Sequence, residues 1–287
     1  DQCNAAAKVF ADANSARFVP PFDHGDIIEG QATVGLELLE QVGKPIDLLI
    51  IPVGGGGLAA GVIQIMTALS PKTRIVLVEP AGAPSLLRSL EAGERVRLNQ
   101  GDNFVDGAAV AQIGELNYAV LKNHDPASVL LIDEDGLCET IVEMLNIEGI
   151  VLEPAGALEV EALRYFDRED IKGKTIVCLT SGGNFDFERL PEVKERALRA
   201  SGCKKYYILR LPQRPGALRE FLDLLGPDDD IARFEYLKKS ARNFGSILLG
   251  VETSAPENFD VLTDKMNDAG FQFQDITDDE LVASFIV

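Results

Sequence analysis

The chain has 287 residues, 46% of them hydrophobic and 25% charged, which is typical of a globular protein with more than one domain. Its net charge of −19 leaves no basic face to neutralise phosphates, so nucleic acid is excluded as a partner. No apolar run approaches the roughly 18 residues that would span a membrane. Four cysteines without a C-x-x-C pair and only two histidines argue against disulfides or a His-rich metal centre and favour the cytoplasm.

Strand-like and helix-like segments alternate over the first two-thirds of the sequence. The apolar, β-branched run at 48–53 is too short for a helix and is typical of a strand buried on both faces of a parallel sheet. The other predicted strands are 17–19, 74–78, 129–132 and 175–179, and the predicted helices are 5–15, 33–42, 58–69, 84–92, 134–146 and 154–166, with a loop at 22–29. This alternation predicts a doubly wound α/β fold.

The pattern of elements changes after about residue 200. The predicted strands are 204–211, 231–239, 245–253 and 271–275, the predicted helices are 216–225 and 258–269, and a turn is expected at Arg242-Asn243-Phe244-Gly245. Strand-helix-strand-strand-helix-strand is the ferredoxin-like order. We therefore expect two domains, 1–200 and 203–287, with the boundary in the polar segment 188–203.

Four consecutive glycines, Gly54, Gly55, Gly56 and Gly57, join the strand at 48–53 to the next predicted helix. One glycine is enough for a turn, whereas four let the backbone approach a ligand and present several N–H groups. With the positive end of the following helix, such groups form a phosphate cradle. The alternative is a flexible strand-to-helix turn. The spacing matches neither a nucleoside-triphosphate P-loop nor a dinucleotide fingerprint.

Three further segments lie where strands are predicted to end. Thr180-Ser181-Gly182-Gly183-Asn184 follows the strand at 175–179, at the sheet edge where ligands bind in open α/β folds. A plain helix N-cap with a glycine turn is an equal alternative. The other two are the loops 104–110 and 153–157, each of which is weak alone.

Six motifs taken in order closely resemble the fold-type II pyridoxal-phosphate (PLP) family of serine and threonine dehydratases and serine racemases. They are Pro21-Phe22-Asp23-His24, Val53 to Leu58, Val78-Glu79-Pro80, Asp106-Gly107, Glu153 to Ala157 and Ser181 to Asn184. The resemblance reaches from the first residues to about residue 200 and implies a parallel α/β core that is incomplete.

The resemblance implies roles for individual residues. Gly54 to Gly57, with Leu58, would bind the PLP phosphate, and Ser181 would hydrogen-bond the pyridine nitrogen. Asp106 and Gly107 would form the loop beside the cofactor and substrate. A hydroxyl at the pyridine nitrogen does not enforce a pyridinium, which suits elimination of a neighbouring hydroxyl group.

Glu79 and the carbonyl of Ala83 align with part of a cation site in relatives such as serine racemases. Those relatives have an acid where this sequence has Ser85, so a bound divalent metal is the less favoured interpretation. The alternative is that Glu79 is a strand-end residue pairing with a nearby cation or N–H group.

The family's Schiff-base lysine lies in an S-x-K-x-R-G-A context, and none of the lysines here has that context. The aligned positions would lie upstream of Asp1, which implies an N-terminally truncated chain. Without that lysine no group would hold the cofactor covalently or remove the substrate's Cα proton. We therefore expect no catalytic residue in this chain and no activity from it alone.

Residues 203–287 resemble the ACT-like regulatory domain of threonine dehydratases, through Tyr207 to Phe221 and Asp228 to Tyr236. Arg214-Pro215-Gly216 ahead of a helix would expose N–H groups to an amino-acid carboxylate, with a plain capped helix as the alternative. This domain favours the biosynthetic threonine dehydratases of the short form.

The biosynthetic family's reaction is the PLP-dependent deamination of L-threonine to 2-oxobutanoate and ammonia in isoleucine biosynthesis. The resemblance implies isoleucine or valine as effectors and a homo-oligomer, a tetramer. Two other functions stay open at this point: a non-catalytic amino-acid-binding protein on the same scaffold, and a serine dehydratase.

Overall fold

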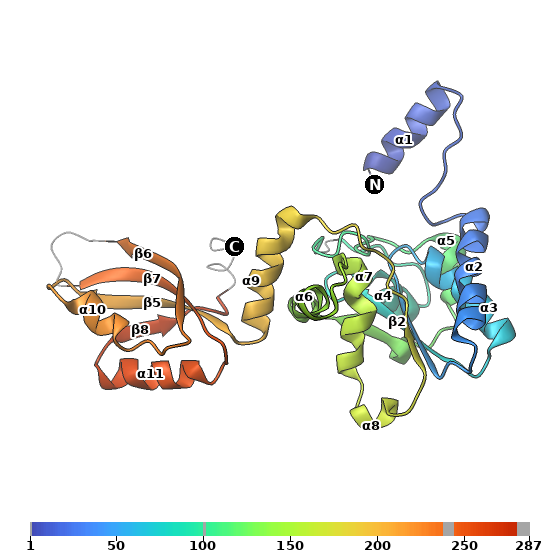
Figure 1. The fold of residues 1–287 in the computed structure, drawn as a ribbon. Helices are drawn as coiled ribbons and strands as arrows, with labels where there is room; N and C mark the ends of the chain where they lie inside the picture. The colour runs from blue at the N-terminus through green and yellow to red at the C-terminus, as the bar shows by residue number, and fades with distance from the viewer. Residues whose placement is uncertain (1, 100–101, 238–243, 280–287) are drawn as a thin grey trace. The chain divides into compact units, whose positions relative to one another are not determined.

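The computed structural model describes residues 2–99, 102–237 and 244–279 (Figure 1). The chain divides into two compact units, Asp1–Glu134 with Leu152–Phe185, and Asp135–Val151 with Asp186–Val287. We call them the α/β unit and the ferredoxin-like unit. The domain bounds 1–200 and 203–287 stay a prediction. In the part of the chain that the structure describes, no helix has the length and apolar character needed to cross a membrane.

The α/β unit is built on one parallel sheet. Its strands are β1 (Leu48–Pro52), β2 (Arg74–Pro80), β3 (Val129–Ile132) and β4 (Ile176–Cys178), in the spatial order β3-β2-β1-β4. The strand order reverses beside β1, since the chain goes from β1 to β2 and β3 on one side and returns to β4 on the other. In open α/β sheets the ligand crevice lies at such a reversal, at the carboxyl ends of the strands.

Helices pack around this sheet in the α/β unit, except α1 (Gln2–Ala13), which projects away from it and is largely exposed (Figure 1). The other helices of the unit are α2 (Gly25–Val42), α3 (Gly57–Leu69), α4 (Ser85–Ala92), α5 (Glu115–Leu121), α7 (Pro154–Glu161) and α8 (Arg168–Ile171), with short 3₁₀ turns at Pro126–Ser128 and Ala162–Tyr165. β1 is buried along its whole length, and its Leu49 and Ile51 join Val62 and Met66 of α3 in the core. The predicted doubly wound parallel fold is confirmed.

Two local predictions in this unit are wrong. Residues 17–19 form no strand, because Pro20 and Pro21 follow at once and no neighbouring strand pairs with them. The predicted loop 22–29 is largely helical, since α2 begins at Gly25. His24 is its N-cap, and its Nδ1 accepts the N–H of Asp26 at 3.2 Å. In addition, β4 is only half-buried, and α5 was not predicted.

The ferredoxin-like unit contains an antiparallel sheet. Its strands are β5 (Lys204–Pro212), β6 (Asp230–Leu237), β7 (Phe244–Glu252) and β8 (Gln272–Asp275), in the order β6-β7-β5-β8. Tyr207, Phe221 and Phe259 lie in its core, where α10 (Ala217–Leu222) and α11 (Asn258–Asp268) pack. The predicted ferredoxin-like order is confirmed. The end of the predicted strand 231–239 and residues Arg242 and Asn243 of the predicted turn lie outside the described residues.

Three further helical segments belong wholly or largely to the same unit: α6 (Glu134–Glu143), continued by a π-helical turn at Met144–Glu148, the 3₁₀ turn Phe187–Arg189, and α9 (Leu190–Ala200). A buried ion network joins α9 to the sheet. Lys204 Nζ donates to Glu195 of α9 and, at 2.7 Å, to Glu252 of β7, and Tyr206 donates to Glu195 at 2.7 Å. These contacts tie α9 to the antiparallel sheet.

Candidate functional site

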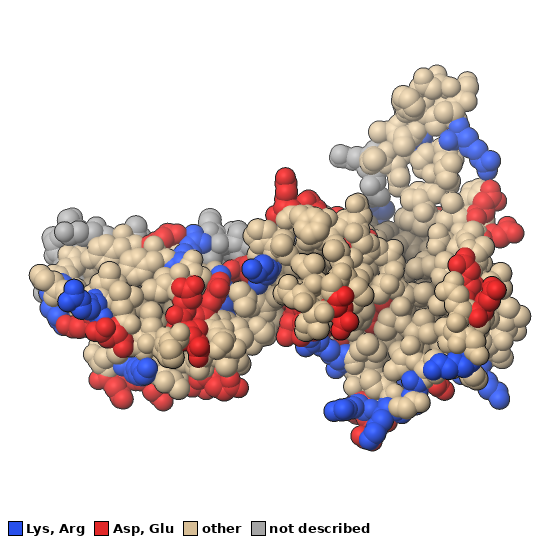
Figure 2. Space-filling view, in the orientation of Figure 1, with Lys and Arg blue, Asp and Glu red and all other residues tan. Residues whose placement is uncertain are grey.

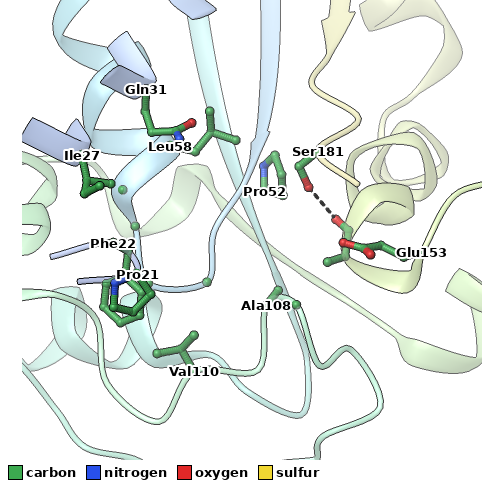
Figure 3. Close-up of a pocket in the computed structure, with 16 residues that line it drawn as sticks. Pro21, Phe22, Ile27, Gln31, Pro52, Leu58, Ala108, Val110, Glu153 and Ser181 are labelled. Atoms are coloured by element: carbon green, nitrogen blue, oxygen red, sulfur yellow. Dashed lines mark hydrogen bonds between the residues drawn. The ribbon is translucent and has the colours of Figure 1, made fainter. Parts of the chain in front are cut away.

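A cavity of about 540 Å³ lies at the carboxyl ends of β1 and β4 in the α/β unit (Figure 3). Its position is the one that the reversal of strand order predicts. The cavity is lined by Pro21, Phe22, Ile27, Gln31, Pro52, Gly54, Gly55, Gly56, Gly57, Leu58, Gly107, Ala108, Val110, Glu153, Ala155 and Ser181. The structure thus brings together the glycine run, Leu58, Gly107 and Ser181 around one space.

The glycine run offers unused hydrogen-bond donors to the cavity. None of the backbone N–H groups of Gly54 to Gly57 has an acceptor in the described part of the chain. Gly56 has φ +90°, and a Cβ on Gly55 would lie 2.2 Å from the ring of Phe22, so side chains do not fit at these positions. Free N–H groups ahead of α3, at the positive end of its dipole, form an anion-binding cradle.

Ser181 follows β4 and supplies a hydroxyl to the cavity wall. Its Oγ donates to the carbonyl of Ala155 at 3.4 Å, as the dashed line in Figure 3 shows. That bond is long for a hydroxyl donor, so the group can exchange it for a ligand acceptor. Free N–H groups on one wall of the cavity and a hydroxyl on another could together hold a ligand that carries both an anionic group and a hydrogen-bond acceptor.

The two residues of the predicted substrate loop behave differently. Gly107 lines the cavity, whereas Asp106 is exposed and is not one of the lining residues. Asp106 Oδ1 accepts the N–H of Gly107 at 2.9 Å. The carboxylate therefore shapes the backbone of this loop.

Glu79 and Ala83 lie away from this cavity. Glu79 is fully buried, and its two carboxylate oxygens accept the N–H groups of Leu86 at 2.7 Å and Leu87 at 2.9 Å. Burial raises the pKa of Glu79 to about 7, although these N–H groups act in the opposite direction. The Ala83 carbonyl accepts the N–H of Ser85. Glu79 thus pairs with N–H groups, as expected for a strand-end residue that binds no metal. Among the described residues, no group of three His, Cys, Asp or Glu side chains is arranged to hold a metal ion.

Sequence reasoning assigned no role to several lining residues. Glu153 was noticed only as part of a loop motif, yet its carboxylate lies at the cavity beside Ser181 (Figure 3). Ile27 and Gln31 reach the cavity from α2, whose first turn had been taken for a loop. The signal that could have found them is Asp26, because an acidic residue in the first turn is typical of a helix start.

Comparison with known proteins agrees with this geometry. The family model of pyridoxal-phosphate-dependent enzymes matches residues 1–182, and that of the C-terminal regulatory domain of threonine dehydratase matches residues 195–286. The L-threonine dehydratase biosynthetic IlvA of Halalkalibacterium halodurans is 42% identical over 282 residues, covering 98% of this chain and 68% of that protein. The protein of the same name from Bacillus subtilis is 43% identical over 281 residues, covering 98% and 66%.

A solved structure of threonine deaminase isoform 2 from Solanum lycopersicum gives a TM-score of 0.63 at 38% identity, over 67% of this chain and 56% of that one. This chain thus spans about two-thirds or less of the length of these relatives. The fold and the cavity define a PLP-dependent enzyme of fold type II. Within that class, the chain belongs to the biosynthetic threonine dehydratases, which carry a C-terminal regulatory domain.

Proposed function

We propose that the cavity of the α/β unit binds PLP, with the phosphate on Gly54 to Gly57 and Leu58 and the pyridine nitrogen on Ser181. The observation that carries this proposal is the set of N–H groups in the glycine run that have no acceptor among the described residues. A phosphate accepts several such donors at once. The backbone of Gly107 would line the cavity beside the substrate. Asp106 would hold the loop that contains both residues in place.

The reaction supported best is the deamination of L-threonine to 2-oxobutanoate and ammonia, a step of isoleucine biosynthesis. Its support is the threonine dehydratase regulatory domain and the names of the relatives. When bound, PLP supplies an electron-withdrawing ring that makes the Cα–H bond of an amino acid easier to break. This chain's residues would anchor and orient that ring. The Ser181 hydroxyl is neutral and would leave the pyridine nitrogen of the cofactor unprotonated.

No lysine lines the cavity in the described part of the chain. We therefore propose that the 287-residue chain binds the cofactor without a covalent bond and does not turn over threonine by itself. In the active protein a lysine from outside these residues would hold the cofactor and move the Cα proton.

An absorbance titration with PLP, followed by borohydride reduction and mass spectrometry, tests this function. We expect saturable binding, no lysine adduct, and weaker binding by about fivefold in Ser181→Ala because one hydrogen bond is lost. When the lysine-bearing segment of the Bacillus subtilis relative is fused to the chain, 2-oxobutanoate should form from L-threonine. A stoichiometric adduct on one lysine of the chain itself would contradict the non-covalent proposal, and a failure to saturate would contradict the site.

We further propose that the ferredoxin-like unit binds isoleucine or valine. A cavity of about 920 Å³ lies where β5 passes into α10, and it is lined by Leu211, Pro212, Gln213, Arg214, Pro215, Gly216, Leu218, Arg219, Leu222, Phe234 and Tyr236. Arg214 is already paired with Glu220 through two bonds of 2.6 Å. Arg219 has no ionic partner among the described residues and is the better carboxylate partner, while Leu222 and Phe234 give an apolar wall for a branched side chain.

Calorimetric titration of the chain with isoleucine and with valine tests the effector site. Arg219→Gln should weaken binding by about tenfold, because it removes a charge-assisted contact to the carboxylate. Arg210→Gln is the matched control, since Arg210 lies on β5 outside the cavity and bonds to Gln272. Equal affinity in the wild type and Arg219→Gln would show that the carboxylate binds elsewhere.

We also propose that the quaternary structure is a homo-oligomer.

A further inference from the structure

The glycine run is held from behind by α5, a helix that the cofactor cavity does not reach. Asn117 of α5 is fully buried, and its Nδ2 donates to the carbonyl of Gly55 at 2.7 Å and to that of Phe22 at 3.3 Å. The backbone N–H of Gly114, just before α5, donates to the same Gly55 carbonyl at 3.1 Å. The Gly55 carbonyl is therefore fixed by two donors from one direction.

This fixed carbonyl decides where the next N–H group points. In a trans peptide the C=O of one residue and the N–H of the following residue point in opposite directions. With the Gly55 carbonyl turned toward Asn117, the N–H of Gly56 is turned away from α5. It has no acceptor among the described residues and belongs to the cradle.

Further contacts keep α5 itself in register with the cavity. The carboxylate of Asp23 accepts the N–H groups of Glu115 at 2.8 Å and Leu116 at 2.9 Å, the first residues of α5. Asp23 is adjacent to Phe22, whose ring occupies the space a Cβ on Gly55 would need and which lines the cavity. Contacts to α5 therefore hold both the segment that carries the Phe22 ring and the glycine run.

We propose that Asn117 is a positioning residue for the phosphate: its amide sets the Gly55–Gly56 peptide so that the cradle is formed before the cofactor binds. This inference rests on the proposed PLP site. A merely structural role predicts a loss of stability when Asn117 is replaced. The positioning role predicts, in addition, a loss of affinity confined to the phosphate group.

The test compares binding of pyridoxine 5′-phosphate and pyridoxine to the full chain by calorimetry. Neither compound has the aldehyde that reacts with lysines, and they differ only in the phosphate. Asn117→Leu keeps the shape of the side chain and removes its donors, so the dissociation constant of the phosphate ester should rise about tenfold, and that of pyridoxine should stay within about twofold. Tyr118→Phe is the control, because it removes another hydrogen bond of α5, to the carbonyl of Ser89 at 3.1 Å. It should leave both constants unchanged.

Asn117→Asp decides the matter if the leucine variant does not fold. A carboxyl group can donate to the Gly55 carbonyl only when protonated, so the ratio of variant to wild-type dissociation constants for the phosphate ester should rise with pH. Asp23 and Glu115 near the start of α5 are common to both proteins and cancel in this ratio. A ratio that is flat with pH would overturn the inference, as would an unchanged affinity in Asn117→Leu. If the wild type itself shows no preference for the phosphate ester, the proposed PLP site is wrong and the inference falls with it.

Discussion

Glu159 on α7 is a fully buried carboxyl group whose oxygens make no hydrogen bond of good geometry in the described chain, although the nearby backbone N–H of Ser181 acts to lower its pKa. Burial raises its pKa to about 9, so at neutral pH it is uncharged in the folded protein. Its neighbour Cys178 donates its thiol to the backbone carbonyl of Glu159 at 3.3 Å, and burial raises the pKa of that thiol to about 12. Cys178 is therefore unreactive at neutral pH.

Glu159 makes the stability of the α/β unit depend on pH. Its pKa rises from 4.5 in the unfolded chain to about 9 in the folded one, so the folded state holds the proton more tightly and stability falls as pH rises between these values. Glu159→Gln cannot titrate, and the melting temperature of this variant minus that of the wild type should grow by about 5 °C or more toward alkaline pH.

Scanning calorimetry at a series of pH values measures this difference. Glu79, whose pKa burial raises to about 7, is present in both proteins, so its own pH dependence cancels in this difference. The change of the difference with pH therefore reports Glu159. A difference in melting temperature that does not change with pH would show that Glu159 is ionised in the folded protein.

The residues of the site were predictable to different degrees. The glycine run and Ser181 carry a local pattern, because a strand end followed by glycines or a hydroxyl has a meaning that can be read along the chain. Asn117 acts on Gly55 across 62 positions of the sequence, through a single amide contact. Asn117 gives no local pattern of that kind, and Glu153 belongs to a motif that does not show its position at the cavity, so the fold is needed to place both.

At the scale of elements, α2 and α3 pack closely enough to leave no room for a methyl group between them. A Cβ on Gly61 of α3 would lie 2.5 Å from the carbonyl oxygen of Ile28 and 2.6 Å from the nitrogen of Ala32, both in the backbone of α2. A backbone cannot rotate away as a side chain can. This contact sets the distance between the two helices beside the cavity of the α/β unit.

Gly61→Ala should therefore destabilise the α/β unit by about 2 kcal/mol or more, because the two helices must separate. Gly30→Ala is the matched control, since Gly30 lies on α2 with nothing within 4 Å of an added Cβ. That change should stabilise the unit by about 0.5–1 kcal/mol, through lower backbone entropy in the unfolded chain. Urea unfolding of both variants provides the measurement, and equal effects would contradict the close packing.

Elements with strong patterns were predicted well, and those that depend on tertiary contacts were not. The buried run of β1 is β-branched and too short for a helix, and these local features determine its type without a period. α5 has only seven residues, and its first turn is capped by Asp23, which is far from it in sequence. At 17–19, strand propensity was outweighed by the lack of a pairing strand.

At the scale of the molecule, acidic side chains are spread over the face shown in Figure 2, with fewer basic ones among them, in keeping with the net charge of −19. Such a charge favours solubility and says nothing about the fold. The alternation of elements predicted both fold classes, but the order of strands in each sheet follows from long-range pairing and could not be read from the sequence.

The position of β4 at the edge of the parallel sheet has a consequence for biosynthesis and folding. β4 pairs with β1, and beside that pair the N–H of Thr175 bonds to Asp47, 128 positions earlier in the chain. Pairs far apart in sequence form more slowly than local ones, so we expect this pairing to form late on the folding pathway. A chain still growing on the ribosome holds the glycine run before Ser181 has been made, and the two walls of the cavity come together when β4 docks.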